Sequence, residues 1–363
     1  MSDPVGAMSD PATFWAAGPS RIAVFRALNL GDFLCAVPAL RMLRRAAPAA
    51  RITFIGLASV RSCLPRFRRY IDEFVEFPGD PAFPEQPPRL DELPGFYRAM
   101  RERRFDLALQ LHGSGARSNA IVQALGARRW AGFVPDRSAQ APWAMAWPDT
   151  RPEIVRYLLL LRHLGVPGPD DPGMEFPLEA ADHERADELA RRLRMDLRRM
   201  VFMHPGARLA SRRWLPERYA AVGRRLAREG WRIGVTGSAG ERALTSSLAA
   251  SIGAAALDLG GRTDLGTLAS LLQRGRLLIC NDTGVSHVAA AVRAPSVVIA
   301  SGSDVARWAP LDTRLHPVLH ADVPCRPCAH DHCPVPGHPC AARVGAEEVL
   351  RLARGLLAGG ERP

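Results

Sequence analysis

Asn281-Asp282-Thr283-Gly284-Val285-Ser286-His287 decides the fold, because this stretch joins an apolar run to a helix of small residues. The run before it, residues 277–280, reads as a buried strand, and the helix is expected to begin near Val288. At such a junction the free backbone N–H groups and the helix dipole favour an anion such as phosphate. Asp282 and His287 add an acceptor and a donor. The stretch therefore predicts an α/β domain with an anion site at this turn.

A second strand–turn–helix junction lies near the N-terminus, where the apolar residues 21–26 precede Leu30-Gly31-Asp32. Gly31 lets a ligand approach the backbone closely. Asp32 could remove a proton from an attacking hydroxyl, or it could serve only as the N-cap of the following helix. Two such junctions far apart in one chain predict two α/β domains that face each other across a cleft.

The composition is that of a globular protein with more than one domain. A chain of 363 residues exceeds what one hydrophobic core usually serves, and 47% of its residues are hydrophobic and 23% charged. No apolar run approaches the roughly 20 residues that span a bilayer. Residues 1–20 lack a basic region followed by an apolar core, which argues against a secretory signal and favours the cytoplasm. We interpret these 20 residues as a disordered leader.

The formal net charge is +11, and every basic side chain apart from histidine is arginine. This excess would draw the protein towards anions such as nucleotides or an acidic membrane surface. No basic cluster is interleaved with stacking aromatics, so we expect no nucleic-acid partner. The arginines between residues 61 and 69 form a basic patch that either meets lipid or an anionic acceptor or is a solvated face. Its members are Arg61, Arg66, Arg68 and Arg69.

Strands alternate with helices in two series, which predicts parallel sheets built from βαβ units. Expected strands cover 22–25, 51–57, 75–77, 106–111, 130–133, 200–204, 231–236, 256–259, 277–280 and 296–300. Expected helices cover 33–46, 118–125, 153–164, 217–229, 239–252, 265–273, the segment from 288, and 347–357. The predicted organisation is a leader 1–20, an N-terminal Rossmann-like domain 21–165, a linker 166–174, a C-terminal Rossmann-like domain 175–344, and a final helix and tail 345–363.

Polar turns follow two more strands of the second series. Gly206 permits close approach of a ligand, and Arg212 and Arg213 could clamp a diphosphate or point into solvent. Gly237 precedes Glu241, whose carboxylate could hold ribose hydroxyls or only complement a helix dipole. Three such turns after strands of one domain favour a nucleotide site more strongly than any one of them.

Three segments resemble the bacterial heptosyltransferases of glycosyltransferase family nine. These are RIAVFRALNLGDFLCAVPALRMLRR, HPGARLASRRWLPERYAAVGRRL and LLICNDTGVSHVAAAVRAPSVVIASGSDVARWAP, and the likeness runs from about residue 21 to 344. The resemblance implies a GT-B fold, in which two Rossmann-like domains with parallel sheets face a central cleft. It also implies that Asp32 is the catalytic base and that Arg212 stands where the family has a lysine. The candidate donor-binding residues are Gly206, Ser211, Arg212, Gly237, Glu241, Asp282, Thr283, Gly284 and His287.

The resemblance further implies the reaction. The expected activity is inverting transfer of heptose from ADP-L-glycero-D-manno-heptose to a lipopolysaccharide core, with no cofactor needed for catalysis. The enzyme would be cytoplasmic, with peripheral contact at the anionic inner face of the inner membrane. The last helix is expected to pack back on the first domain. Two alternatives are the same fold with another nucleotide sugar or a protein acceptor, and a non-catalytic binding or assembly module.

Two further sets of residues are candidates for other roles. The spacing Cys325-x2-Cys328-x4-Cys333-x6-Cys340 suits a structural Zn or Fe site, with reduced thiols or disulfides as alternatives. Cys35, Cys63 and Cys280 read as small core residues. His112, at the end of a strand of the first domain, is either an acceptor contact or an ordinary turn histidine, and Arg61 is the other candidate for acceptor binding.

Overall fold

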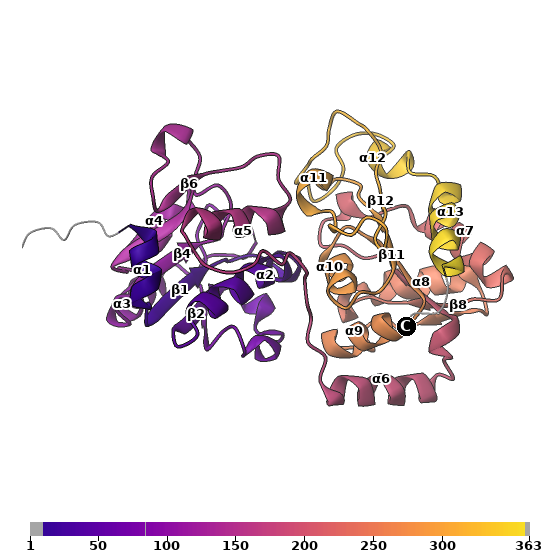
Figure 1. The fold of residues 1–363 in the computed structure, drawn as a ribbon. Coiled ribbons are helices and arrows are strands. Elements are labelled where there is room, and N and C mark those ends of the chain that lie inside the picture. Colours follow the sequence, from indigo (N-terminus) through magenta and orange to yellow (C-terminus); the bar gives the residue numbers. More distant parts are fainter. Residues whose placement is uncertain (1–9, 84, 360–363) are drawn as a thin grey trace, which may run out of the picture. The chain divides into compact units, whose positions relative to one another are not determined.

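The computed structural model describes residues 10–83 and 85–359, and the chain divides into two compact units (Figure 1). Unit 1 is Met1–Gly173 and unit 2 is Met174–Pro363, so the division falls within the expected linker 166–174. Each unit holds a six-stranded sheet whose neighbouring strands run parallel. The α/β class expected from the alternating pattern is confirmed.

The sheet of unit 1 has the order β3-β2-β1-β4-β5-β6. The chain moves outward from β1 to β3 and then returns to the other side of β1, so the order reverses between β1 and β4. In this pair Phe25 lies opposite Gln110. The strands are β1 (Arg21–Phe25), β2 (Arg51–Gly56), β3 (Glu73–Glu76), β4 (Leu107–Gln110), β5 (Arg129–Val134) and β6 (Ala144–Ala146).

Helices cover both faces of this sheet because its strands are apolar on both sides. Phe96 and Met100 of α3 and Ile121 of α4 belong to the same buried cluster as Phe25, whereas α2 packs against α5. The helices are α1 (Pro11–Ala17), α2 (Leu30–Ala46), α3 (Leu93–Glu102), α4 (Ser118–Ala124) and α5 (Glu153–His163), with 3-10 turns η1 (Ala58–Val60), η2 (Leu64–Phe67) and η3 (Arg137–Ala139).

Part of the expected leader is a helix, so that expectation is wrong for residues 11–17. Asp10 caps α1 by accepting from the N–H of Ala12 at 2.8 Å, and Gly18 ends it at φ 71°. Trp15 is buried, and its Nε1 donates to the carbonyl of Leu164 at 2.6 Å. One aromatic side chain thus ties the helix to the end of α5. Residues 1–9 lie outside the described part.

The sheet of unit 2 has the order β12-β11-β10-β7-β8-β9, and here the order reverses between β7 and β10. Cys280 of β10 lies opposite His204 of β7. The strands are β7 (Met200–His204), β8 (Arg232–Val235), β9 (Ala256–Asp258), β10 (Leu277–Asn281), β11 (Ser296–Ile299) and β12 (Val318–Leu319).

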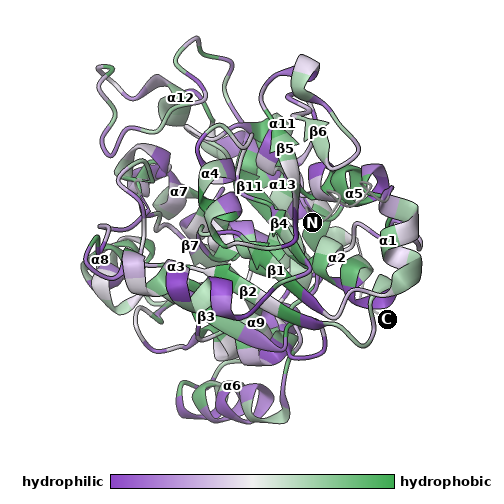
Figure 2. Cartoon of the chain, turned by 90° about the vertical axis from the view of Figure 1, so that its left-hand side faces the viewer, coloured by the Kyte–Doolittle hydropathy of each residue, from purple (hydrophilic) through white to green (hydrophobic). Residues whose placement is uncertain are grey.

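The helices of unit 2 enclose its sheet. They are α6 (Ala180–Arg192), α7 (Pro216–Arg228), α8 (Arg242–Ile252), α9 (Leu265–Arg274), α10 (Gly284–Ala291), α11 (Val305–Trp308), α12 (Pro339–Ala342) and α13 (Ala346–Ala358), with 3-10 turns η4 (Leu197–Arg199), η5 (Ala210–Arg212) and η6 (Ala239–Glu241). Figure 2 shows the strands mostly in the colour of hydrophobic residues and α6 largely in that of hydrophilic ones.

The last helix packs against the core of its own unit, and packing on the first domain stays a prediction. α13 contacts α7, β10 and β11 of unit 2. Val349, Leu350, Ala353 and Leu357 join the buried cluster that also contains Val297. The apolar stripe of α13 is therefore used to complete the core of unit 2.

Candidate active site

Both sheets place polar residues at the carboxyl ends of the strands where the strand order reverses. In open α/β sheets a crevice forms at this point, because the connections on either side of it leave in opposite directions. In unit 1 the residues after β1 and β4 lie there, and in unit 2 those after β7 and β10. Each unit thus has one position where its fold favours a ligand.

Asp32 lies in the first turn of α2 and is not its N-cap. The cap position belongs to Asn29, and α2 begins at Leu30, three residues before the expected start. The Asp32 side chain is 20% exposed, and its Oδ1 lies 3.3 Å from Nη2 of Arg26. Arg26 Nε also donates to the Asp32 carbonyl at 2.8 Å. The carboxylate therefore reaches solvent while a buried guanidinium holds it from behind.

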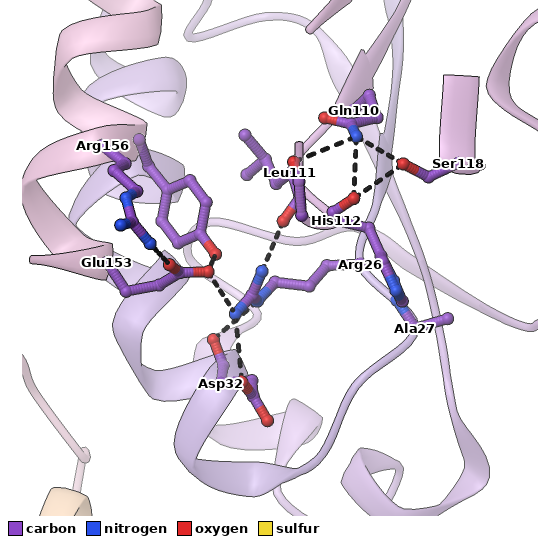
Figure 3. Close-up of polar contacts among 11 residues, drawn as sticks. Arg26, Ala27, Asp32, Gln110, Leu111, His112, Ser118, Glu153 and Arg156 are labelled. Atoms are coloured by element: carbon purple, nitrogen blue, oxygen red, sulfur yellow. Dashed lines mark hydrogen bonds and ion pairs between the residues drawn. The ribbon is translucent and has the colours of Figure 1, made fainter. Parts of the chain in front are cut away.

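Arg26 is the centre of a buried network (Figure 3). Its register beside β4 lets Nη1 donate to the carbonyl of Leu111. Its Nη2 lies 3.3 Å from Oε1 of Glu153, which also accepts from the Tyr157 hydroxyl, and the Arg26 guanidinium stacks 4.7 Å from the Tyr157 ring. Burial alone would lower the pKa of Arg26, but Tyr157, Glu153 and Asp32 raise it well above its ordinary value. Arg26 therefore stays charged.

Glu153 links this network to a second arginine. Its Oε2 accepts from Arg156 Nη1 at 2.8 Å, and Arg156 also donates to the carbonyls of Pro148 and Asp149. Glu153 and Arg156 are both buried. Our sequence analysis missed these residues, although an arginine at the end of an apolar strand is a signal, because a charge is rarely buried without a partner.

His112 is held by contacts within its own unit. Its Nδ1 accepts from the N–H of Ala27 at 3.3 Å, and its ring stacks on Phe83 with centroids 4.3 Å apart. Gln110 Nε2 and the Ser118 hydroxyl both donate to its carbonyl. These contacts fix the ring beside the end of β1, near Arg26 (Figure 3). Contact with an acceptor stays a prediction.

Arg61, the second candidate for acceptor binding, is paired on the surface. Its Nη2 lies 2.7 Å from Oε2 of Glu76, and its guanidinium sits 4.8 Å from the Phe74 ring. In the same basic patch Arg69 lies over the ring of Tyr70 at 4.8 Å. The patch is thus partly neutralised by a neighbouring carboxylate.

In unit 2 the buried Asn281 braces two turns at once. The register beside β7 places it opposite the chain after His204, and its Nδ2 donates to the carbonyls of Pro205 and Gly206 at 2.8 and 3.2 Å. Its Oδ1 accepts from the N–H of Trp214 at 2.8 Å. Asn281, the first residue of the stretch 281–287, therefore holds the turn that contains Gly206, the glycine turn, in place.

The remaining residues of that stretch form the start of α10. The helix begins at Gly284 rather than near Val288, with Thr283 as its N-cap in a capping box with Ser286. The Ser286 N–H donates back to Thr283, but the other N–H groups of the first turn have no acceptor inside the helix, so they can bind an anion. Asp282 is buried, and no hydrogen bond or ion pair joins its carboxylate to another described residue. The buried His287 lies in the same helix, with its ring 6.5 Å from that of Trp308.

Glu241 packs against the glycine turn. An added Cβ on Gly206 would lie only 2.0 Å from Glu241 Oε1, so the close approach needs glycine at position 206. Glu241 Oε2 accepts from the N–H and the hydroxyl of Ser238, both at 2.8 Å. Burial alone would raise the pKa of Glu241, but the bonds from Ser238 and the nearby His204 and Arg213 lower it. Glu241 is therefore an ionised carboxylate that also completes a capping box.

Gly237, the other glycine of this turn, is also tightly packed. An added Cβ there would lie 2.7 Å from Cγ2 of Thr245. Beneath the turn, His204 Nδ1 and the Thr236 hydroxyl lie 3.0 Å apart, and burial lowers the pKa of His204. The glycines therefore allow the turn after β8 to lie close to the turn after β7.

The three residues 211–213 have different surroundings. Ser211 is buried, and its hydroxyl donates to the carbonyl of His330 rather than pointing towards the glycine turn. Arg213 donates to the carbonyl of Ala207 from Nε and Nη2, at 3.0 and 2.9 Å. Arg212 Nε is buried without a hydrogen-bond partner among the described residues. Of the two arginines, Arg212 is therefore the one available to a ligand.

The four clustered cysteines lie near one another in unit 2. All seven cysteines of the chain are free thiols. Burial and the neighbouring Cys325, Cys333 and Cys328 raise the pKa of Cys340, so the four lie within electrostatic range of one another. Within residues 10–83 and 85–359, however, no three Cys, His, Asp or Glu side chains are grouped so that they could hold a metal ion. The Zn or Fe site stays a prediction, which metal analysis of protein purified without a histidine tag can test.

Cys35, Cys63 and Cys280 are buried, as expected of small core residues. Burial raises the pKa of Cys63 to about 12.

In the described part of the chain, every helix is too short or too polar to cross a bilayer.

The two Rossmann-like units, each with polar residues where its strand order reverses, define the GT-B class of glycosyltransferases. A family model, Glycosyltransferase family 9 (heptosyltransferase), matches residues 95–338. Because this match covers more than half of the chain, the protein belongs to that family and is a glycosyltransferase. The resemblance inferred from the sequence is confirmed.

Known proteins similar to this chain agree with the family. Lipopolysaccharide heptosyltransferase 1 of Pseudomonas aeruginosa is 26% identical over 326 residues, which cover 86% of this chain and 87% of the relative. The solved structure of a family 9 glycosyltransferase from Veillonella parvula has a TM-score of 0.77 at 21% identity, covering 94% of this chain and 98% of that one. The ADP-heptose lps heptosyltransferase II of E. coli has a TM-score of 0.70 at 21% identity, covering 93% and 98%.

Proposed function

We propose that this glycosyltransferase moves heptose from ADP-heptose to a lipopolysaccharide core or a related surface glycan, with inversion at the anomeric carbon. The relative from P. aeruginosa is named a lipopolysaccharide heptosyltransferase, and the E. coli structure is titled with ADP-heptose. The observation that carries the proposal is the polar lining of unit 2, because three turns with glycines or free N–H groups follow the adjacent strands β10, β7 and β8.

In this proposal unit 2 binds the donor. The N–H groups at the start of α10 and the Arg212 guanidinium would hold the diphosphate, since both favour anions. The ionised Glu241 would accept hydrogen bonds from the ribose hydroxyls, and Gly206 keeps the backbone free of side-chain atoms beside it. An arginine in place of the family's lysine keeps the positive charge and adds a planar fork of donors.

Asp32 would be the general base. Its carboxylate takes the proton of an acceptor hydroxyl while that oxygen bonds to the anomeric carbon. The bond from this carbon to the diphosphate breaks on the opposite face, and ADP leaves with the electron pair. Arg212 and the N-terminus of α10 stabilise the growing negative charge. Since these groups supply positive charge at the leaving group, we propose catalysis that does not depend on a metal ion.

The acceptor is proposed to be a glycolipid that the enzyme reaches at an anionic membrane surface. The net charge of +11 supports this, and so does the basic patch, of which Arg68 is an exposed member. His112, held beside Ala27 at the end of β1, is the proposed acceptor contact (Figure 3).

The test is turnover with defined donors. We would incubate the protein with ADP-heptose, ADP-glucose or UDP-glucose and a heptose-deficient core glycolipid, and weigh both the glycolipid and the protein by mass spectrometry. The expected product is a glycolipid heavier by one heptose, formed from ADP-heptose alone. A product from another donor, or a heptose on protein, would favour the alternative substrates. No transfer, together with an Asp32→Ala strain of normal phenotype, would favour a binding module.

A further inference from the structure

Ser211 is hydrogen-bonded to the cysteine-rich segment, residues 325–340, through both its backbone and its side chain. Its N–H donates to the carbonyl of Asp331 at 3.0 Å, and its hydroxyl donates to the carbonyl of His330. Its own carbonyl accepts from His338 Nε2 at 2.8 Å, so this ring nitrogen carries the hydrogen. Every polar group of Ser211 is thus used to join the turn η5 to this segment.

Arg212 follows Ser211 directly, and its buried Nε has no hydrogen-bond partner among the described residues. Its position therefore depends on the backbone before it and on the loop that packs beside it. An added Cβ on Gly302 would meet Cys328 Sγ at 2.8 Å, the Ser211 carbonyl at 3.7 Å and Arg212 Cγ at 3.8 Å. Gly302 is where the arginine turn, the loop after β11 and the cysteine-rich segment meet.

The cysteine-rich segment also holds the loop after β11, through hydrogen bonds to backbone carbonyls of that loop. The N–H of Cys328 donates to the Gly302 carbonyl at 2.9 Å, and Arg326 Nη2 donates to the Ser303 carbonyl at 3.0 Å. The Ser301 and Ser303 hydroxyls are buried and have no partner in the described part of the chain. The loop therefore has little side-chain bonding of its own and relies on the segment.

The segment is in turn anchored in the core. Cys340 and Ala341 of α12 are buried in the main cluster of unit 2. His338, the residue before α12, has φ 45°, a left-handed conformation that non-glycine residues rarely adopt. A conformation of this kind persists only where surrounding contacts impose it, and the bond to Ser211 is one of these contacts.

We propose that the cysteine-rich segment is a positioning element of the donor site, and that His338 acts through Ser211 to place Arg212 against the nucleotide diphosphate. The segment contributes no atom to the reaction. It fixes the turn that carries Arg212, so its loosening weakens donor binding while the chemical step continues. This inference rests on the proposed role of Arg212.

The test compares His338→Ala with the wild type by calorimetric binding of ADP, by donor kinetics and by hydrogen exchange of the backbone at residues 208–215. We expect ADP binding weaker and the donor KM higher by roughly threefold to tenfold, the effect of losing one hydrogen bond. We expect kcat to fall by less than the donor KM rises, since Arg212 already holds the charged diphosphate in the ground state, and we expect faster exchange at 208–215. His338→Gln, whose amide can donate from a similar position, should restore binding.

Two further variants keep the outcome clear. Gly302→Ala adds a methyl group that would press on Cys328 Sγ, and it should raise the donor KM in the same way. His332→Ala removes an exposed histidine of the same segment and should change nothing. Unchanged ADP affinity and unchanged exchange in folded His338→Ala and Gly302→Ala would overturn the proposal. A wild type that binds no ADP would instead overturn the proposed function, while the exchange data still decide whether the segment positions the turn.

Discussion

The junction after β1 and the junction after β10 look alike in sequence, since each places an aspartate where a strand passes into a helix. They differ in how that aspartate is held. Asp32 is tied to a buried arginine, which is itself paired with the buried Glu153. The Asp282 carboxylate has no hydrogen bond or ion pair to another described residue, although its backbone N–H donates to the Ile299 carbonyl at 3.0 Å. The side chain of the neighbouring Asn281 bonds to backbone carbonyls instead. The first junction fixes one charge, whereas the second leaves backbone N–H groups free.

This difference suits two functions, proton transfer at the first junction and diphosphate binding at the second. A group that transfers a proton must stay within hydrogen-bonding reach of one atom, so a rigid network around it is useful. A site that binds a diphosphate needs several donors aimed at one region, and a helix N-terminus with glycine turns supplies them. Damage to the first junction should therefore mainly lower kcat, and damage to the second should mainly raise the donor KM.

The largest effect is expected for Asp32→Asn. This change keeps the shape of the side chain but removes the base, so kcat should fall by about 10²- to 10⁴-fold. Steady-state turnover measures the loss, and calorimetry with ADP should show unchanged donor affinity. Turnover near that of the wild type would mean that another group accepts the proton.

Arg26→Met is expected to lower both stability and kcat. The Arg26 guanidinium joins Glu153 to Asp32 through two ion pairs, and breaking a buried ion pair costs about 3–5 kcal/mol. Urea unfolding and kcat would be measured together. The matched control is Arg156→Met, which removes the other partner of Glu153 without touching Asp32, and it should lower stability alone. If both variants lose kcat equally, Arg26 has no specific effect on the base.

Arg212→Ala tests the second junction. Losing a charge-assisted contact to the diphosphate should raise the donor KM by roughly 10- to 100-fold, since such bonds contribute about 1.5–3 kcal/mol. Arg208→Ala removes an exposed arginine of the same loop and serves as the control. An equal rise of KM in both variants would point to general attraction of anions rather than to a specific contact.

The smallest effect is expected from pH. Burial lowers the pKa of His204 in the folded protein, so the unfolded chain binds this proton more readily. The associated stability is present above the unfolded value of about 6.5 and is lost as the pH falls below it. Urea unfolding at pH 7.5 and pH 5.5 should show a loss for the wild type that is smaller in His204→Gln. An identical loss in both would assign the pH effect to other groups.

The alternating strands and helices were readable because buried strands such as 277–280 are uniformly apolar. Helix starts were placed too late at α2 and α10, since the first turns there contain Gly31 and Asp32 or Gly284 and Ser286, residues that are common in loops. α1, α3 and α6 were not predicted at all. In α6 the sequence AADHERADELARR is so polar that its apolar positions give a weak pattern.

The candidate site was only partly predictable. The NDTG turn and Asp32 could be found from local sequence. The pairing of Arg26 with Glu153 joins residues 127 positions apart, and the use of Ser211 by residues 330–338 joins segments more than 100 apart. Local patterns carry no information on such distances, so Arg26 and Glu153 were missed and Ser211 was assigned to the donor.

The bond from Trp15 to Leu164 has a practical consequence for anyone who shortens this enzyme. A version that starts at residue 20 would look harmless in the sequence, yet it would lack Trp15, whose buried indole bonds to the end of α5. The Leu164 carbonyl would then lose this hydrogen bond and be exposed to water. That carbonyl stands just before the residues that join the two units. Trimming should therefore stop ahead of Asp10, the residue that caps α1.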